Sequence, residues 1–408
     1  MPGLWRNRDF VLLQTGRLLS NLGSQMSSLA YPLLVLAITH SAAKAGIVGF
    51  VRTLPWALFA LPAGVAADRW SRKRMMIGSD VARAVAVGAL ATAVGLGHAV
   101  FWVIAVVAFV EGTGAAVFMA AQPGALRAVV RRRQLPAASA VETGRSAAGM
   151  LAGPPAGGAL FSIAHALPFI VDAASYAAST VSLLAMRTPF QEKRKPDTAS
   201  LRARFSEGFR FLWHQPFLRT TAFLYGLTNF IGPGVLLALV VIGRRQGLSG
   251  GVVGVLVAAF AGCLLLGSFV SGYVRRVLPV RGVLLLELWT WVGCSAFVAW
   301  PNAYVLAASI LPTALAIPST DSVVTAYRIS ITPDRLLGRS ESVRSTIALL
   351  IAPLGPLAAG LLLDAVSARV TIAVFAAAGL ALAAWGTLSP AIRAAPSLDE
   401  LDVETAAG

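Results

Sequence analysis

Long apolar stretches, interrupted by short polar ones, run through almost the whole chain. A helix needs about 20 mostly apolar residues to cross a membrane. Stretches of that kind lie at twelve places: 11–39, 45–67, 75–97, 100–126, 137–163, 166–186, 217–242, 251–273, 281–300, 302–327, 342–363 and 370–388. Backbone groups in lipid must be hydrogen-bonded within their own segment, and these long runs do not suit an alternating barrel. The pattern predicts an all-α membrane protein with twelve transmembrane helices.

Composition and charge add orientation to this prediction. Of the 408 residues, 57% are hydrophobic and 13% are charged, whereas soluble domains carry about 25% charged residues. The net charge of +16 raises the alternative of a nucleic-acid partner. With the N-terminus placed in the cytoplasm, however, 24 of the 34 basic residues fall in the termini and loops of that side. This is the positive-inside pattern, so we expect two cytoplasmic termini and no nucleic-acid partner.

The chain also repeats itself once. GVAADRWSRK begins at Gly64, and GSFVSGYVRR begins 203 residues later at Gly267. GPPAGGAL at Gly153 and GPLAAGLL at Gly355 are 202 residues apart. Two pairs at nearly one offset indicate a duplicated six-helix half, as in transporters built from parallel repeats. This predicts two pseudo-symmetric six-helix halves, 1–187 and 216–390, with a cytoplasmic linker, 188–215, and a cytoplasmic tail, 391–408.

The linker carries a possible surface helix. Its longest polar segment, TPFQEKRKPDTAS, is followed by SLRARFSEGFRFLW, in which Leu201, Phe205, Phe209 and Leu212 share one helical face. Such a face predicts a short amphipathic helix on the cytoplasmic surface of the membrane. A plain basic linker is the alternative.

The motif at Gly64 carries a family resemblance. GVAADRWSRK resembles G-x-x-x-D-R-x-G-R-R/K, which lies between the second and third helices of the major facilitator superfamily, although Ser71 stands where glycine is usual. SNLGSQMSSLAYPLLVLAIT, FMAAQPGALRAVVRRRQLPAASAV and TPDRLLGRSESV resemble one branch, the macrolide-efflux and enterobactin-exporter-like drug:proton antiporters. The resemblance covers nearly the whole chain and implies the major facilitator fold.

The resemblance assigns a role to the charged motif. It implies that Asp68 helps to latch the outward-facing state, with Arg72 as its partner four residues on and Gly64 allowing close helix approach. An ordinary surface ion pair is the alternative for Asp68, and Arg69 and Lys73 also suit orientation charges at lipid headgroups.

The fifth predicted helix contains a second motif, GPPAGG. It resembles the segment often found in antiporters of the superfamily, and its glycines and prolines permit close packing and a bend. Simple tight packing, without influence on the direction of transport, is the alternative. The motif residues are Gly153, Pro154, Pro155, Gly157 and Gly158.

Several charges fall inside predicted spans, where each must face the bundle interior or water. Asp80 with Arg83, and Glu142 with Arg145, are i,i+3 pairs on one helix face. Mutual neutralisation is the favoured interpretation of both pairs, and proton coupling the alternative. Further basic residues in or at the ends of spans are Arg17, Arg52, Arg219 and Arg344, while Asp172 and Asp364 lie near outer ends, where we expect water.

Three acids, Glu111, Glu287 and Asp321, lack a basic neighbour on their own helix. Glu111, in VAFVEGTGAAVF, lies deep in the fourth span, so we predict that it carries the coupled proton. A salt bridge to Arg17 or Arg145 is the alternative. Relatives often carry an acid at the position of Ser24, so a role held there must have moved.

Other polar and aromatic residues are candidates for the substrate cavity. Arg17, Asn21 and Gln25 form an i, i+4, i+8 stripe on the first helix, with polar packing between helices as the alternative. Trp289 and Trp291 in the ninth helix are candidates for contact with a flat apolar substrate or for packing.

Together these features favour a secondary active transporter that exports an amphiphilic small molecule, of drug, natural-product or siderophore type, by proton antiport with alternating access. A proton-coupled uptake symporter and a non-transporting scaffold or sensor are the alternatives. No phosphate-loop or H-E-x-x-H motif occurs, so we expect no enzyme, cofactor or metal. The GC-rich codon usage implied by the composition favours a bacterial inner membrane, with substrate, protons and lipid as partners of a monomer.

Overall fold

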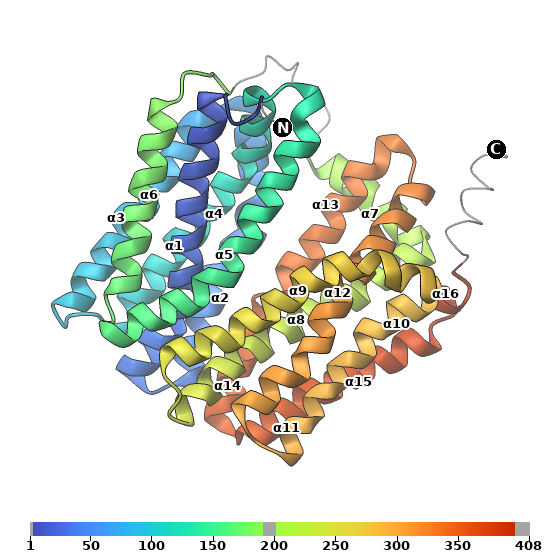
Figure 1. Cartoon of the computed structure of the whole chain (residues 1–408). Coiled ribbons are helices and arrows are strands. Elements are labelled where there is room, and N and C mark those ends of the chain that lie inside the picture. Colours follow the sequence, from blue (N-terminus) through green and yellow to red (C-terminus); the bar gives the residue numbers. More distant parts are fainter. Residues whose placement is uncertain (1–2, 191–200, 396–408) are drawn as a thin grey trace. The chain divides into compact units, whose positions relative to one another are not determined.

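The computed structural model describes residues 3–190 and 201–395, and these residues form helices and connecting turns without a strand (Figure 1). The helices before the linker are α1 (Arg8–Thr39), α2 (Ala42–Arg69), α3 (Arg72–Gly95), α4 (Phe101–Val129), α5 (Leu135–Ile163) and α6 (Leu167–Ala185), with a short 3-10 turn, η1 (Arg132–Gln134), before α5. The prediction of an all-α membrane protein is confirmed.

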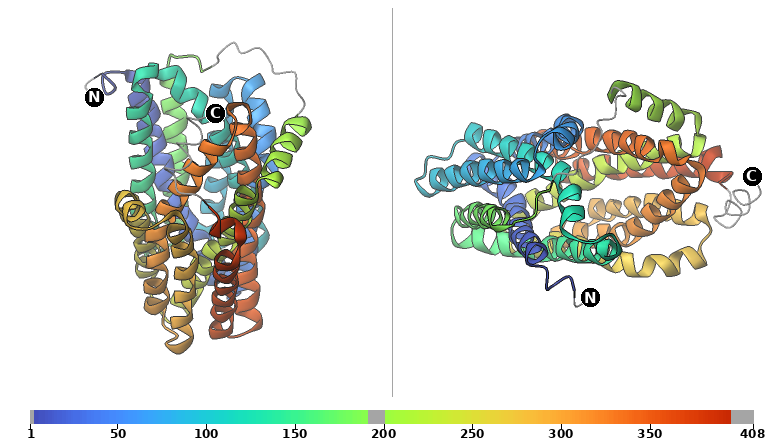
Figure 2. Two further views of the ribbon diagram at one scale, coloured as in Figure 1. Left: turned by 90° about the vertical axis from the view of Figure 1, so that its right-hand side faces the viewer. Right: turned by 90° about the horizontal axis from the view of Figure 1, so that it is seen from above.

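The helices from residue 201 onward are less regular. They are α7 (Leu201–His214), α8 (Pro216–Arg245), α9 (Gly250–Val277), α10 (Val280–Thr290), η2 (Trp291–Ser295), α11 (Ala296–Ala299), α12 (Ala303–Ile331), α13 (Asp334–Ile351), α14 (Leu354–Ala365), α15 (Ala368–Leu388) and α16 (Pro390–Arg393). Figure 2 shows the same helices from two further sides.

Two predicted spans are interrupted. The span predicted at 281–300 consists of α10, the 3-10 turn η2 and α11, and the span predicted at 342–363 breaks between α13 and α14. Pro353 precedes α14, and proline lacks the N–H that would continue the hydrogen-bond ladder. Hydropathy alone did not locate these breaks, because a helix kink leaves the apolar run intact.

Eleven helical segments of the described residues are long and apolar enough to cross a membrane. The remaining long helix, α5, has 29 residues but is not among the eleven, because its glycines, serines and prolines dilute its hydropathy. Its length of about 1.5 Å per residue still exceeds the hydrocarbon core.

The chain divides into two compact units. Unit 1 contains the described residues up to Phe190 and the segment 243–258, which comprises the end of α8 and the start of α9. Unit 2 contains residues 201–242 and 259–395. In unit 1, α1 packs on α5 and α6, α4 packs on α2 and α3, and α3 packs on α6.

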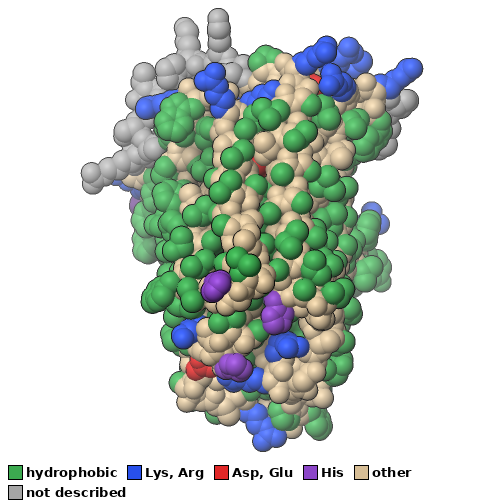
Figure 3. Space-filling view, turned by 90° about the vertical axis from the view of Figure 1, so that its left-hand side faces the viewer, with side chains coloured by type: hydrophobic (Ala, Val, Ile, Leu, Met, Phe, Trp, Pro, Cys, Tyr) green, Lys and Arg blue, Asp and Glu red, His purple; other side chains and the backbone are tan. Residues whose placement is uncertain are grey.

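Hydrophobic side chains form both the interior and the exterior of these bundles. A buried cluster in unit 1 contains Phe10, Leu13, Met76 and Phe118. One outer face is covered by hydrophobic side chains, with Lys and Arg gathered toward its two ends (Figure 3). Such a surface suits a hydrocarbon core with headgroups on either side.

The helix α7 lies against α13 within unit 2. A Cβ built at Gly208 would lie 2.5 Å from the Arg339 carbonyl oxygen, and Glu207 forms an ion pair with Arg339. Leu212 is buried, whereas Phe209 and Trp213 are exposed and stack with ring centroids 5.5 Å apart. Exposed aromatic rings of this kind suit a membrane interface. The side chain of Leu201 lies outside the described residues.

Candidate functional site

Unit 1 contains a polar cavity of about 630 Å³. Its walls come from five helices, α1 to α5. The lining includes four arginines, two glutamates and several amides and hydroxyls: Arg17, Ser20, Asn21, Ser24, Gln25, Arg52, Thr53, Arg83, Glu111, Gln122, Glu142, Thr143, Arg145 and Ser146. Such a concentration of charge inside apolar helices is costly unless it pairs or contacts water, and it marks a functional region.

The α1 stripe lines this cavity. Arg17, Asn21 and Gln25 succeed one another at helical spacing along one wall. Glycines of α5 let the two helices approach there: a Cβ built at Gly149 would lie 1.9 Å from Asn21 Nδ2, and one at Gly153 would lie 2.3 Å from Gln25 Cβ. The small residues of α5 thereby fix the stripe against a second helix.

An ion-pair group joins α1 to α5 at one side of the cavity. Arg17 Nη2 lies 3.0 Å from Glu142 Oε1, and Arg145 Nη2 lies 3.9 Å from the same oxygen. Arg145 also donates a 2.9 Å hydrogen bond to the Arg17 carbonyl oxygen, and Gln122 donates to Glu142. Glu142 therefore forms ion pairs with two guanidinium groups. The i,i+3 spacing in the sequence indicated the pair with Arg145 but not the one with Arg17.

Glu111 pairs with Arg52, a partner that neither sequence alternative named. Arg52 Nη2 lies 2.7 Å from Glu111 Oε1, and Nε lies 3.2 Å from Oε2. The Glu111 side chain is 3% exposed and that of Arg52 is 25% exposed. The alternative of a salt bridge from Glu111 to Arg17 or Arg145 is wrong, because both of those arginines contact Glu142.

Arg83 completes the charged interior of unit 1. It forms the expected ion pair with Asp80, whose other oxygen accepts a 2.7 Å hydrogen bond from Ser179 of α6. The guanidinium carbon of Arg83 also lies 4.3 Å from the centroid of the Tyr176 ring, a cation–π distance. Asp80 and Arg83 are both buried.

Asp172 departs from its sequence prediction. We expected it near outer water, but it is fully buried on α6. Ser27 of α1 donates a hydrogen bond to Asp172 Oδ2, and Ser175 Oγ lies 3.4 Å from Oδ1. The correction has a packing cause: Gly23, where a Cβ would lie 2.7 Å from Asp172 Oδ1, brings α1 over this carboxyl. Asp364, by contrast, is exposed.

The α2–α3 connection carries the charged motif. Arg72 Nη2 lies 3.5 Å from Asp68 Oδ1, and the Asp68 side chain is 69% exposed. Arg72 also donates to the Ala67 carbonyl oxygen, and Lys73 Nζ donates a 2.6 Å hydrogen bond to that of Met186. Arg69 is exposed.

Within unit 1, Gly64 makes no close approach to another helix, since a Cβ built there meets no atom within 4 Å. A close approach in this region occurs instead at Gly124 of α4, where a Cβ would lie 2.4 Å from Arg72 Nη1. The motif arginine, not the motif glycine, therefore contacts a neighbouring helix here.

The GPPAGG motif of α5 packs on two neighbours within unit 1. A Cβ built at Gly157 would lie 2.4 Å from the Met26 carbonyl oxygen of α1. A Cβ built at Gly158 would lie 2.0 Å from the Gly250 carbonyl oxygen at the start of α9, and one at Gly254 would lie 2.3 Å from that of Pro154. Backbone touches backbone at these points, so larger residues do not fit without movement.

Unit 2 holds the remaining candidates. Glu287 of α10 is buried, whereas Asp321 of α12 is exposed and lines a small pocket with Tyr225 and Arg344. Trp291 is 2% exposed, so packing is its role here. Trp289 is 46% exposed, and its Nε1 donates a 3.2 Å hydrogen bond to Thr387.

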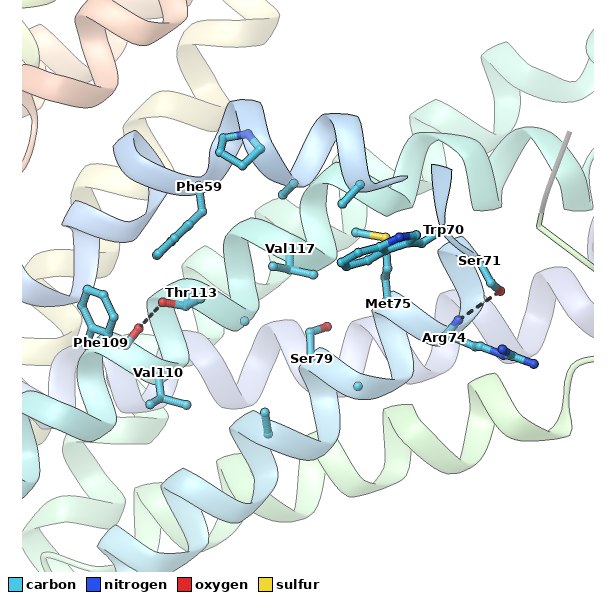
Figure 4. Close-up of a pocket in the computed structure, with 16 residues that line it drawn as sticks. Phe59, Trp70, Ser71, Arg74, Met75, Ser79, Phe109, Val110, Thr113 and Val117 are labelled. Carbon is cyan, nitrogen blue, oxygen red and sulfur yellow. Dashed lines mark hydrogen bonds between the residues drawn. The ribbon is translucent and has the colours of Figure 1, made fainter. Parts of the chain in front are cut away.

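A second pocket of unit 1 is larger than the charged cavity, but its lining is mainly apolar. It measures about 1020 Å³ and lies between α2, α3 and α4, with Phe59, Phe109 and Val117 on its walls and Trp70 and Arg74 toward one end (Figure 4). Two of its polar groups are already used locally, since Thr113 donates to the Phe109 carbonyl oxygen and Ser71 accepts from the Arg74 N–H. An apolar pocket of this kind offers contact surface but little polar recognition.

Within the residues described, no group of three or more His, Cys, Asp and Glu side chains is placed to hold a metal ion. Several of the charged groups, among them Glu111, Asp80 and Glu142, instead form ion pairs. The two cysteines, Cys263 and Cys294, are free thiols. The charged cavity of unit 1 suits electrostatic contact with a solute.

Comparisons with known proteins agree with this geometry. The Major Facilitator Superfamily pattern matches residues 15–242, more than half of the chain. The multidrug efflux pump Tap of Mycolicibacterium fortuitum is 27% identical over 409 aligned residues, which cover 96% of this chain and 97% of that protein.

Solved structures show the same fold. A bacterial homologue of the human lysosomal transporter Spinster, inward-facing and unoccupied, has a TM-score of 0.76 at 17% identity, covering 95% of this chain and 97% of that one. A bacterial homologue of the iron transporter ferroportin, also inward-facing, has a TM-score of 0.72 at 18% identity, covering 94% and 98%. The chain therefore belongs to the major facilitator superfamily: it is a multi-pass membrane transporter similar to a drug-efflux pump, not an enzyme.

Proposed function

We propose that this transporter exports an amphiphilic small molecule in exchange for protons. The observation that carries the proposal is the charged cavity of unit 1, with its four arginines and two glutamates within apolar helices. Burial of these charges in the membrane costs free energy that a purely structural role does not require. A transporter, by contrast, needs charged groups that the solute and protons can reach in turn. Likeness to an efflux pump over 96% of the chain supports export.

The cavity lining favours an amphiphile. Polar side chains occupy the α1 and α5 sides, while Trp56, Phe118 and Met119 contribute apolar surface. A ligand with one flat apolar part and one polar or charged part would satisfy both kinds of contact. Drug, natural-product and siderophore classes all contain such molecules.

We further propose how the chain is organised and oriented in the membrane. Two six-helix halves, 1–187 and 216–390, alternate access to the cavity, joined by the 188–215 linker and followed by the tail 391–408. The protein acts as a monomer in a bacterial inner membrane, and both termini are cytoplasmic. The basic residues of the alternate loops support this orientation.

Direction and coupling can be tested in vesicles. We expect inverted membrane vesicles, acidic inside, to accumulate one of a panel of fluorescent amphiphilic dyes, and the accumulation to collapse when a protonophore removes the pH gradient. Vesicles without the protein are the control. Uptake confined to right-side-out vesicles would favour the symporter, and absence of transport of every dye in both orientations would contradict proton-driven export of such amphiphiles.

The ion pairs narrow the choice of proton-binding acid. Glu111, Asp80 and Glu142 each contact at least one guanidinium group. In the part of the chain that the structure describes, neither Glu287 nor Asp321 forms an ion pair. We therefore propose these two acids of unit 2 as coupling candidates beside Glu111, whose proton uptake would require release of Arg52.

Asp68 offers a test of the proposed latch. We expect Asp68→Asn to reduce dye transport at least about tenfold, equivalent to about 1.4 kcal/mol, while the amount of protein in the membrane stays unchanged. The reason is that its exposed side chain contributes little to folding in this state. Asp68→Glu restores the carboxylate and should recover transport; full activity of Asp68→Asn would contradict the latch.

A further inference from the structure

Asp172 carries a buried carboxyl whose hydrogen-bond partners, among the residues that the structure describes, are hydroxyl groups only. Its oxygens contact Ser27 Oγ on α1 and, at 3.4 Å, Ser175 Oγ one turn further along α6. Ser175 in turn donates a 2.7 Å hydrogen bond to the Asp172 carbonyl oxygen. With the Ser175 hydrogen in that bond, the Ser27 hydroxyl is the one that donates to the carboxylate, and it stabilises the ionised form less completely than a guanidinium would. Asp172 thus differs from Glu111, Asp80 and Glu142, which each contact a guanidinium group.

The four arginines that line the cavity form ion pairs with acids other than Asp172. Arg52 is paired with Glu111, and Arg83 with Asp80. The two remaining arginines of the cavity, Arg17 and Arg145, both contact Glu142. Asp172 is therefore left without an ion pair among the described residues of unit 1; Asp9, the other buried acid without one, instead accepts from the Arg187 and Thr188 N–H groups.

Charged and titratable groups nevertheless surround Asp172 at longer range. Arg52 of α2, Arg83 of α3 and Glu111 of α4 all act on it electrostatically. Tyr31 of α1 and Tyr176 of α6 also interact electrostatically with Asp172. The charged residues of α5, Glu142 and Arg145, instead contact Arg17. Glu111 opposes a negative charge on Asp172, and the two arginines favour one, so the charge of Asp172 is set by a balance among neighbours.

A further buried polar group lies near this carboxyl. The Tyr31 hydroxyl, one turn after Ser27, makes no hydrogen bond within the described residues. Tyr31 is 1% exposed, its ring stacks edge-on against Phe169 of α6, and the Arg52 guanidinium carbon lies 5.4 Å from its ring centroid. The Ser27 hydroxyl oxygen also lies 3.3 Å from the carbonyl oxygen of Ser24, a residue that lines the cavity. Polar groups thus continue from the cavity to Asp172.

We propose that Asp172 is a proton-binding site of this transporter, separate from the Glu111–Arg52 pair. Its carboxylate takes up one proton to become a neutral carboxylic acid, and no other bond is made or broken. The neutral form still accepts from Ser27 at one oxygen and can donate its new O–H to Ser175 at the other. This inference rests on the proposed proton-coupled function for its physiological use, but the binding of the proton itself does not.

The direct test needs no substrate. Infrared difference spectra between acidic and alkaline pH, taken on the purified protein in lipid vesicles, show the carbonyl band of each carboxyl that binds a proton. We expect one such band to be lost in Asp172→Asn and retained in Glu287→Gln, the matched change at a buried acid of unit 2. A difference spectrum of Asp172→Asn identical to that of the natural protein would overturn the proposal.

A second variant covers the case in which Asp172→Asn does not fold. Ser27→Ala leaves the carboxyl in place but removes the hydrogen bond to Oδ2. The Asp172 carbonyl band should therefore change frequency while the other carboxyl bands stay in place. An unchanged spectrum of Ser27→Ala would count against Asp172 as the titrating group.

Transport separates this inference from the proposed function. We expect Asp172→Asn to lose dye accumulation driven by a pH gradient while it retains dye exchange at equal pH, because exchange needs no net proton movement. Equal gradient-driven accumulation by Asp172→Asn and the natural protein would remove Asp172 from the coupling step. If the natural protein moves no dye in response to a pH gradient, the proposed function fails, and the infrared result alone decides whether Asp172 binds a proton.

Discussion

Replacement of Arg52 by glutamine should leave little folded protein in the membrane. Arg52 holds Glu111 through two hydrogen bonds of 2.7 and 3.2 Å, and the Glu111 side chain is 3% exposed. Removal of one partner from a buried ion pair costs about 3–5 kcal/mol, because the other charge is left buried without compensation. A loss of that size is a large share of the stability of an ordinary domain. Fluorescence-detected size-exclusion chromatography of solubilised membranes measures the folded amount.

The double variant decides what the pair is for. If the pair is structural, Arg52→Gln with Glu111→Gln should recover folded protein, because two neutral amides can hydrogen-bond where two charges did. Arg335→Gln is the control, since Arg335 pairs with Glu207 but is 76% exposed, and surface pairs contribute only about 0–1 kcal/mol. If Glu111 carries the proton, Glu111→Gln alone should fold and exchange substrate but fail to concentrate it. Equal folding of Arg52→Gln and Arg335→Gln would contradict the burial argument.

The pair also shows where sequence reasoning ends. Periodicity placed Arg17, Asn21 and Gln25 on one face of α1, and the structure places all three along the cavity. The same reasoning found Asp80 with Arg83, because those residues share one helix. It did not find Arg52 for Glu111, since hydropathy indicates which face of a helix is buried but not which helix lies opposite. The signal in the sequence was an arginine inside the second span with no acid close to it along the same helix.

Asp172 illustrates a second limit. Its span was predicted at 166–186, close to the observed Leu167–Ala185, so the error did not lie in the helix boundaries. It lay in the assumption that a residue near a span end contacts water. Gly23 of α1 brings a neighbouring backbone over the first turns of α6 and covers the carboxyl. Such cover depends on how helices pack side by side, which single-helix patterns do not contain.

For the GPPAGG motif, the sequence identified the residues but did not distinguish tight packing from control of transport direction. Packing on α1 involves Gly157, whereas packing on the start of α9 involves Gly158 and Pro154. The motif therefore makes separate contacts with two neighbouring helices, and the two interpretations, tight packing and control of transport direction, can be tested at one contact at a time. A substitution at Gly158 addresses the α9 contact alone.

We expect Gly158→Ala to lower the stability of the folded protein, and Gly144→Ala not to. A Cβ at Gly158 would lie 2.0 Å from the Gly250 carbonyl oxygen, whereas one at Gly144, on the same helix, meets nothing within 4 Å. Overpacking costs about 1–3 kcal/mol, and here the obstacle is backbone, which cannot turn aside as a side chain can. Alanine at an unobstructed helix position instead gains about 0.5–1 kcal/mol over glycine, so the two variants should shift the melting temperature in opposite directions.

Comparison of transport with folded amount then separates the two roles of the motif. If the α5–α9 contact serves packing only, transport by Gly158→Ala should fall in proportion to folded protein and return when expression is matched. If the contact governs the direction of transport, transport per folded molecule should fall as well, while Gly144→Ala transports normally. A melting temperature of Gly158→Ala at or above that of the natural protein would show that α9 moves aside at no cost. The close approach at Gly250 would then be incidental to both stability and transport.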